Sequence, residues 1–336
     1  MSIRLAINGF GRIGRLVYRA ILESKRNDVE VVCVNDLGPA ATNAHLLKYD
    51  SVHGTLPFDV KAKDSTIDAG QGPVRVTAER DPSKLPWREM GVDVALECTG
   101  LFTSKDKAKA HVDAGAKRVL ISAPADGVDF TVVYGINNDQ LSDTHVVVSN
   151  GSCTTNCIVP VAYVLHNAVG IQRGFMTTVH SYTGDQVPLD TLHKDLRRAR
   201  AAGMSMIPTS TGAARAVSLV LPELKGKIDG TAIRVPTPNV SLIDFTFVPN
   251  RKTSKDEVND AVRKAAGSGP LKGVLGFSDA PLVSHDYNHD PRSSILDSLE
   301  TQVIEGEFVR VLAWYDNEWG FSNRMVDTAV AMGKTI

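Results

Sequence analysis

The 336-residue sequence has only four cysteines, almost no net charge and no long apolar run. Four cysteines in a chain of this length argue against a disulfide framework and favour reduced thiols. The 37 basic and 38 acidic residues nearly cancel, so we expect no overall attraction to nucleic acid or to an anionic membrane. No apolar stretch approaches the roughly 20 residues of a membrane helix, and no signal-peptide pattern precedes the first strand. These absences predict a soluble, cytoplasmic protein.

The length and the 43% apolar composition are enough for two domains, each with its own core. Near the middle of the sequence, the segment 149–157 surrounds Cys153 with hydroxyl and amide side chains. An apolar run follows and stops at Gly170, which predicts a helix that begins near Cys153 and is bent by Pro160. A thiol at the positive end of a helix dipole favours the thiolate, so Cys153 is a candidate nucleophile.

A metal site or a redox pair is the alternative interpretation of Cys153 and Cys157. The other two cysteines, Cys33 and Cys98, lie alone in apolar runs and are expected in core strands. We therefore expect no metal site, and we expect Cys157 to be packed one helical turn from Cys153.

A Gly-x-Gly-x-x-Gly motif at Gly9, Gly11 and Gly14 lies between an apolar strand and a helical pattern. This context indicates a dinucleotide site, because the glycines allow a tight turn and a close approach of the pyrophosphate to the helix start. Asp36 ends the next strand, at about the spacing of 20 residues expected for the acid that binds the adenosine ribose. A carboxylate there repels a 2′-phosphate and favours NAD over NADP. The alternative is that Asp36 is only a turn residue.

Further strands are expected at 92–98 and 118–122, with a helix at 105–115 between them. This alternation predicts a parallel, doubly wound sheet with its ligand at the carboxyl ends of the strands, where Thr99 and Ser122 lie. The segment 49–79 has the pattern of inserted antiparallel strands.

In the second half, a strand at 174–180 ends in His180, which could be the base or cationic partner of a catalytic thiol. The basic cluster around Arg198 lacks the interleaved aromatics of a nucleic-acid surface, and fits phosphate binding and salt bridges better. The segment 208–214 offers hydroxyls and N–H groups at a helix start, and Arg234 in an apolar stretch needs an anionic partner. Two anion sites suggest a phosphorylated substrate and a second, mobile phosphate.

Together, the motifs at 7–15, 152–157, 234–240 and 314–320 resemble the phosphorylating glyceraldehyde-3-phosphate dehydrogenases, and the resemblance spans essentially the whole chain. It implies a Rossmann-type doubly wound parallel sheet plus an α+β catalytic domain with a mainly antiparallel sheet. The implied domains are an NAD-binding domain at 1–151, a catalytic domain at 152–317, and a C-terminal helix at 318–336 that returns to the NAD-binding domain.

The resemblance also implies a reaction. Cys153 would attack D-glyceraldehyde 3-phosphate, His180 would take the hydroxyl proton as hydride passes to NAD, and inorganic phosphate would cleave the thioester to 1,3-bisphosphoglycerate, in glycolysis or gluconeogenesis. The implied cofactor contacts are Gly9, Gly11, Arg12, Ile13, Gly14, Asp36, Arg80, Thr99, Ser122 and Asn317. Thr183 and Arg234 would hold the C3 phosphate, Arg198 would lie between the two phosphate sites, and the attacking phosphate would bind to Ser152, Thr154, Thr211 and Gly212. The family implies a homotetramer, with 182–203 between subunits.

Small departures from the family pattern occur at Gly151, Gly184 and Phe321 and at Thr191-Leu192, and none removes a catalytic group. Erythrose-4-phosphate dehydrogenase, which shares the cysteine and histidine but hydrolyses its thioester, is the nearest alternative. The segments 181–186 and 208–212 favour the glyceraldehyde-3-phosphate type. A further alternative is a non-catalytic role, with Cys153 as a redox sensor.

Overall fold

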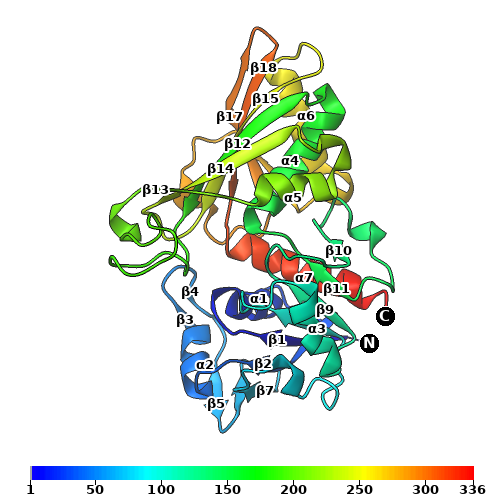
Figure 1. The fold of residues 1–336 in the computed structure, drawn as a ribbon, viewed down its shortest axis with the longest axis vertical. Coiled ribbons are helices and arrows are strands. Elements are labelled where there is room, and N and C mark those ends of the chain that lie inside the picture. The colour runs from blue at the N-terminus through cyan, green and yellow to red at the C-terminus, as the bar shows by residue number, and fades with distance from the viewer. Residues whose placement is uncertain (1) are drawn as a thin grey trace. The chain divides into compact units, whose positions relative to one another are not determined.

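Two large sheets organise the chain in the computed structural model, which describes residues 2–336 (Figure 1). The nine-stranded sheet belongs to a first unit, which comprises the chain up to Gly151 and Ser322–Ile336. The seven-stranded sheet belongs to a second unit, Ser152–Phe321. No helix within residues 2–336 combines the length and the apolar character needed to cross a membrane.

The sheet of the first unit has the strand order β10-β11-β9-β8-β1-β2-β7-β6-β5. Its strands are β1 (Ile3–Asn8), β2 (Val29–Asn35), β5 (Lys61–Lys63), β6 (Thr66–Asp68), β7 (Pro73–Thr77), β8 (Val94–Glu97), β9 (Arg118–Ile121), β10 (Phe130–Thr131) and β11 (Val147–Ser149). Neighbours from β10 to β7 are parallel, whereas β5, β6 and β7 pair antiparallel. The strand order reverses between β1 and β8, which makes this point the topological switch of the sheet.

The central strands are continuous apolar runs, which allows both of their faces to be buried. The helices of this unit are α1 (Arg12–Glu23), α2 (Ala40–Lys48) and α3 (Lys105–Asp113). The antiparallel strands expected within 49–79 are present, and β3 (Tyr49–Asp50) and β4 (Gly54–Thr55) form a separate pair. Helix α7 (Trp319–Gly333) begins in the second unit, and its residues from Ser322 belong to the first.

The sheet of the second unit has the order β13-β14-β12-β15-β18-β17-β16. Its strands are β12 (Arg173–Ser181), β13 (Ile207–Thr209), β14 (Ile228–Val235), β15 (Ser241–Val248), β16 (Leu275–Ser278), β17 (Ser294–Ile304) and β18 (Phe308–Tyr315). Most neighbours are antiparallel, but β12 runs parallel to β14 and β16 runs parallel to β17. Figure 1 shows the helices α4 (Cys153–Val169), α5 (Ala213–Val220) and α6 (Lys255–Gly267) together on one face of this sheet. The predicted fold class is confirmed.

Helix α4 begins at Cys153, as predicted, and ends before Gly170, which has a φ of 73°. The helix continues without interruption through Pro160. Most of its residues are buried, and this packing holds the helix together where proline removes one backbone donor. The same helix therefore carries Cys153 and forms part of the core of the second unit.

Candidate active site

A cavity of about 470 Å³ lies where β1, β2, β7 and β8 end in the first unit. Five of the residues predicted to contact the cofactor line it, namely Gly9, Gly11, Asp36, Arg80 and Thr99. The cavity therefore occupies the switch point at which doubly wound sheets bind their ligands.

The three glycines of the motif meet three different requirements. Gly9 has a φ of 90°, and a Cβ there would lie 2.7 Å from the backbone nitrogen of Thr99. A Cβ on Gly14 would lie 2.1 Å from the carbonyl oxygen of Gly9, so this glycine allows α1 to pack closely against the turn. Gly11 faces open space, and no side chain caps α1 there. This arrangement fits a pyrophosphate at the helix start.

Asp36 is held by the backbone around it. One carboxylate oxygen accepts a hydrogen bond from the N–H of Phe10 and the other from the N–H of Gly38, each at 3.0 Å. These two bonds fix the carboxylate at the carboxyl end of β2, where it lines the cavity. It has the position and the charge to accept ribose hydroxyls and to repel a 2′-phosphate.

The remaining predicted cofactor contacts do not line this cavity. The guanidinium of Arg12 bonds to the carboxylate of Asp50, and the half-buried Ile13 follows it in α1. Ser122 directly follows β9, and its N–H donates to the carbonyl of Glu97 at 3.0 Å. Asn317 belongs to the second unit.

Sequence reasoning missed several residues that line the cavity: Asn8, Asn35, Glu79, Cys98, Leu101 and Phe102. Asn8 and Asn35 are the last residues of their strands, and this position was the available signal. The prediction that Cys98 lies in a core strand is wrong. Strand β8 ends one residue earlier, so Cys98 is half-buried at the cavity, where burial and the adjacent Glu97 raise its pKa to about 12. Cys33 is fully buried in β2, as predicted.

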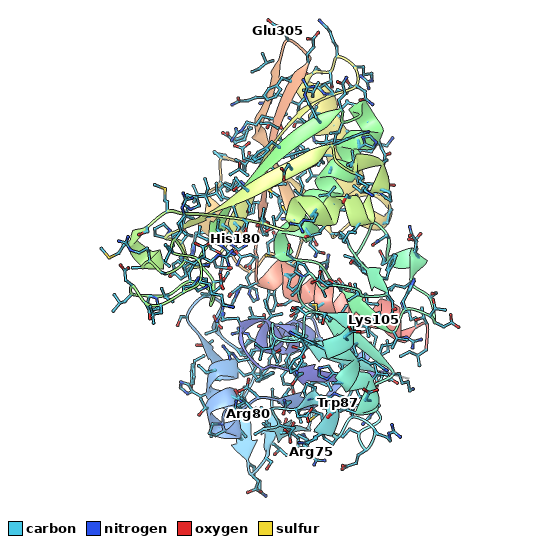
Figure 2. The ribbon with its side chains drawn as sticks, viewed as in Figure 1. Arg75, Arg80, Trp87, Lys105, His180 and Glu305 are labelled. Atoms are coloured by element: carbon cyan, nitrogen blue, oxygen red, sulfur yellow. The ribbon has the colours of Figure 1, made fainter. Side chains whose placement is uncertain are left out.

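In the second unit, Cys153 and His180 lie together. The sulfur of Cys153 is 3.4 Å from Nε2 of His180 (labelled in Figure 2), which β12 carries near its end. Ser152 caps the helix of Cys153, because its hydroxyl accepts a hydrogen bond from the N–H of Thr155 at 3.0 Å. Cys157 is buried, with its sulfur 3.2 Å from the hydroxyl of Ser294, so it packs as predicted.

Arg234 completes this cluster. It is paired in register with His180 on the neighbouring parallel strand, and its Nη1 lies 2.8 Å from His180 Nδ1 and 3.0 Å from the carbonyl oxygen of Ser181. The same carbonyl is 2.7 Å from His180 Nδ1. The guanidinium can only donate, and the Ser181 carbonyl accepts from it. In the tautomer with its proton on Nδ1, His180 donates to the same carbonyl, and the Nε2 lone pair then faces the sulfur.

Burial and the Arg234 cation lower the pKa of His180 to about 3, so this imidazole is neutral at pH 7. Burial raises the pKa of the Cys153 thiol, whereas Arg234 and the hydrogen bonds of Thr154 act in the opposite direction. The helix start and His180 therefore do not by themselves produce the low thiol pKa expected from the sequence. Arg234 is the cation that favours the thiolate.

The hydroxyls proposed from the sequence as phosphate ligands have different surroundings. Thr183 donates from its N–H and its hydroxyl to the side-chain oxygen of Gln186, at 3.0 and 3.2 Å. The Thr154 hydroxyl is buried, 2.9 Å from the Tyr315 hydroxyl. Thr211 accepts from the N–H of Ala213 at 3.2 Å.

Gly212 precedes α5 and has no side chain to cap the helix, whose first N–H group, that of Ala213, bonds to Thr211. Arg198 donates from Nε to the Thr209 hydroxyl at 2.9 Å and also bonds to Asp185. Asn317 accepts hydrogen bonds at Oδ1 from the hydroxyls of Ser181 and Ser241, at 2.8 and 2.9 Å. These two bonds fix the orientation of its amide and leave the NH2 group to donate elsewhere.

Comparison with known proteins agrees with this arrangement. Residues 3–105 match the family model described as glyceraldehyde 3-phosphate dehydrogenase, NAD binding domain, and residues 152–317 match the model of the C-terminal domain of the same family. The chain is 68% identical over 334 residues to the glyceraldehyde-3-phosphate dehydrogenase of Xanthobacter flavus, with 99% of each chain covered.

It is 65% identical to the enzyme of that name from Cereibacter sphaeroides, over the full length of both chains. It is 55% identical to glyceraldehyde-3-phosphate dehydrogenase 1 of Bacillus subtilis, with 99% of each covered. These relatives do not favour the erythrose-4-phosphate alternative. The chain belongs to the glyceraldehyde-3-phosphate dehydrogenase family, and it is an NAD-dependent oxidoreductase of that family.

Proposed function

We propose that this chain oxidises D-glyceraldehyde 3-phosphate and transfers the acyl group to inorganic phosphate, giving 1,3-bisphosphoglycerate through a thioester on Cys153. The observation that carries the proposal is the distance of 3.4 Å between the Cys153 sulfur and His180 Nε2, beside the Arg234 cation. We place this reaction in glycolysis or gluconeogenesis, in the cytoplasm.

In the proposed reaction, the Cys153 sulfur attacks the aldehyde carbon and forms a hemithioacetal. Nε2 of His180 takes the proton of the new hydroxyl, since the imidazole is neutral and its Nε2 faces the sulfur. Bound NAD supplies the hydride acceptor. The carbon then holds a thioester, whose sulfur leaves when a phosphate oxygen attacks the carbonyl.

Two groups of residues are proposed to hold the two phosphates. Arg234 and Thr183 would bind the C3 phosphate, Arg198 would serve between the sites, and the attacking phosphate would bind to Ser152, Thr154, Thr211 and Gly212. Within residues 2–336, the buried Nε of Arg234 has no hydrogen-bond partner, so a phosphate oxygen would satisfy it. The start of α5, which follows Gly212 and has the Thr211 hydroxyl beside its first N–H group, supports the second site. The Thr154 hydroxyl already bonds to Tyr315, so its place in the set rests on the resemblance.

The proposed cofactor contacts are those predicted from the sequence, from Gly9 to Ser122 in the first unit and Asn317 in the second. The glycine turn and the fixed carboxylate of Asp36 support NAD binding at the cavity of the first unit. The NH2 group of Asn317 is proposed to contact the nicotinamide amide, because its carbonyl oxygen is already bonded to two serine hydroxyls.

We also propose that the chain forms a homotetramer in which the segment 182–203 lies between subunits. The segment carries large apolar side chains in solvent at Leu189, Leu192 and Leu196, and the exposed Met204 and Met206 follow it. Leu192 is fully exposed, and an apolar group of this size is typical of a protein interface. Light scattering on the purified protein should give four chains per particle. A monomer would contradict this part of the proposal.

The reaction is tested by NADH formation with glyceraldehyde 3-phosphate and NAD, with and without inorganic phosphate, and with erythrose 4-phosphate in parallel. We expect turnover that depends on phosphate and favours glyceraldehyde 3-phosphate. Equal turnover without phosphate would contradict the acyl transfer, and a preference for erythrose 4-phosphate would contradict the substrate.

A further inference from the structure

A carboxylate is buried at the end of β8 in the first unit. Glu97 is only 1% exposed. Its Oε1 accepts hydrogen bonds from the backbone N–H of Thr99, at 2.8 Å, and from the Thr99 hydroxyl. Its Oε2 lies 2.7 Å from Nδ2 of Asn8 and 2.9 Å from Nε2 of His111. Four polar groups therefore converge on two oxygens.

The donors and acceptors in this cluster fix the charge of Glu97. The indole N–H of Trp87 (labelled in Figure 2) donates to Nδ1 of His111 at 3.0 Å, and an indole can only donate. Nδ1 of His111 is therefore an acceptor, so the proton of the imidazole is on Nε2 and is donated to Glu97. All four partners of Glu97 are donors, which is the environment of an ionised carboxylate. His111 is neutral, so hydrogen bonds alone hold this negative charge.

Asn8 is held from two sides. Because a carboxylate only accepts, Asn8 must present its NH2 group to Glu97, and its Oδ1 then accepts from Asn35 Nδ2 at 2.7 Å. The backbone of Glu79 fixes Asn35, since its N–H donates to Asn35 Oδ1 and its carbonyl accepts from Asn35 Nδ2, each at 2.8 Å. Glu97 and the Glu79 backbone therefore set the two ends of one hydrogen-bond chain across the ends of β8, β1, β2 and β7.

Most of this chain of hydrogen bonds borders the cavity. Asn8, Asn35, Glu79 and Thr99 all line it, whereas Glu97 does not. Thr99 also packs against the first glycine of the motif, since a Cβ on Gly9 would lie 2.7 Å from its backbone nitrogen. Glu97 thus connects the glycine turn to the polar side chains on the other strand ends.

We propose that Glu97 is a positioning residue for the dinucleotide: its buried negative charge holds the turn at Thr99 and the NH2 group of Asn8. The inference rests on the proposed function for the identity of the ligand, NAD. Glu97 itself does not touch the cofactor. It acts through Thr99 and Asn8, which line the cavity.

The first test is Glu97→Gln, which keeps the shape and removes the charge. An amide has one accepting oxygen, so its NH2 group would face two of the four donors, and either the Thr99 turn or Asn8 with His111 would lose its acceptor. Calorimetric titration of the full chain with NAD gives affinity and number of sites separately. We expect affinity to fall about 10-fold or more, with the number of sites per chain unchanged.

Two further variants separate this effect from general damage. Trp87→Phe removes the indole N–H and frees His111 to change tautomer, and we expect a smaller loss of NAD affinity, about 2- to 5-fold. Glu89→Gln is the matched control, because this carboxylate is 70% exposed and pairs with Arg75; its NAD affinity should equal that of the unmodified protein. In all three variants, iodoacetamide without NAD should alkylate Cys153 at the same rate as in the unmodified protein.

An affinity within twofold of the unmodified protein for a folded Glu97→Gln variant would overturn the inference. A lower number of NAD sites per chain with unchanged affinity at the remaining sites would also overturn it. That result would mean that Glu97 only keeps part of the protein folded. If Glu97→Gln does not fold, unchanged NAD affinity in Trp87→Phe would overturn it. If the unmodified protein does not bind NAD, the cofactor assignment fails, and the inference fails with it.

Discussion

Arg234 and His180 lie side by side because they are paired in register on parallel strands, with Nη1 of the arginine 2.8 Å from Nδ1 of the histidine. The arginine therefore acts electrostatically on both proposed catalytic groups. It lowers the pKa of His180 and favours the thiolate of Cys153. A single cation thus keeps the base unprotonated and makes the nucleophile more acidic.

Replacing Arg234 by methionine should shift the pH dependence of Cys153. Without the cation, the pKa of His180 rises from about 3, and the thiol pKa, which burial already raises, rises further. The rate of alkylation by iodoacetamide, measured against pH without NAD, should therefore move to higher pH. Arg197→Met is the control, because Arg197 is exposed, and its profile should not move. An unchanged profile in Arg234→Met would show that the guanidinium does not act on the thiol.

Cys153→Ser should reduce NADH formation by at least about 1000-fold, because a serine hydroxyl beside a neutral imidazole is a much weaker nucleophile. Cys157→Ser is the matched comparison on the same helix. Its sulfur is buried beside Ser294, so we expect a loss of unfolding free energy of about 1 kcal/mol and retained turnover. Substantial turnover in Cys153→Ser would rule out the thioester.

Asp36→Ser should relax the preference for NAD. The substitution removes the charge that repels a 2′-phosphate, so the ratio of kcat/KM for NAD to that for NADP should fall about 10- to 100-fold. The N–H groups of Phe10 and Gly38 also lose their acceptor, so the variant should unfold at a lower temperature. Steady-state rates with both cofactors check the ratio. An unchanged ratio of kcat/KM for the two cofactors would show that residues other than Asp36 determine the preference for NAD.

Alanine substitutions at two glycines of the motif should affect different properties, stability at Gly14 and NAD affinity at Gly11. Gly14→Ala places a Cβ 2.1 Å from the carbonyl oxygen of Gly9 and should lower the free energy of unfolding by about 1–3 kcal/mol. Gly11→Ala places its Cβ in open space, so the fold should be retained while NAD affinity falls. Urea unfolding and calorimetry measure the two effects. Full NAD affinity in Gly11→Ala would show that the pyrophosphate does not approach this residue.

The sequence predicted the features that depend on neighbouring residues. The glycine motif, the acid at the end of the next strand and the helix that begins at Cys153 are local patterns. The proximity of His180 and Arg234 depends on the pairing of β12 with β14, strands that are far apart in the sequence, and no local pattern reveals it. The bonds of Glu97 could not be predicted either, because they join residues on separate strands and helices.

One difference between prediction and structure follows from a strand boundary. The sequence placed Cys98 inside a strand because the apolar run continues up to it, but the strand ends at Glu97, whose carboxylate holds the following turn. At Pro160 the helix continues, and the bend predicted there stays a prediction.

The in-register pairing of β12 and β14 makes the proposed chemistry sensitive to chain length. Side chains alternate between the two faces of a strand, so deleting one residue early in β14 would turn Arg234 to the opposite face from His180. Such a deletion could leave an intact sheet and an inactive protein. Among relatives of this chain, changes in length should therefore be absent from β14.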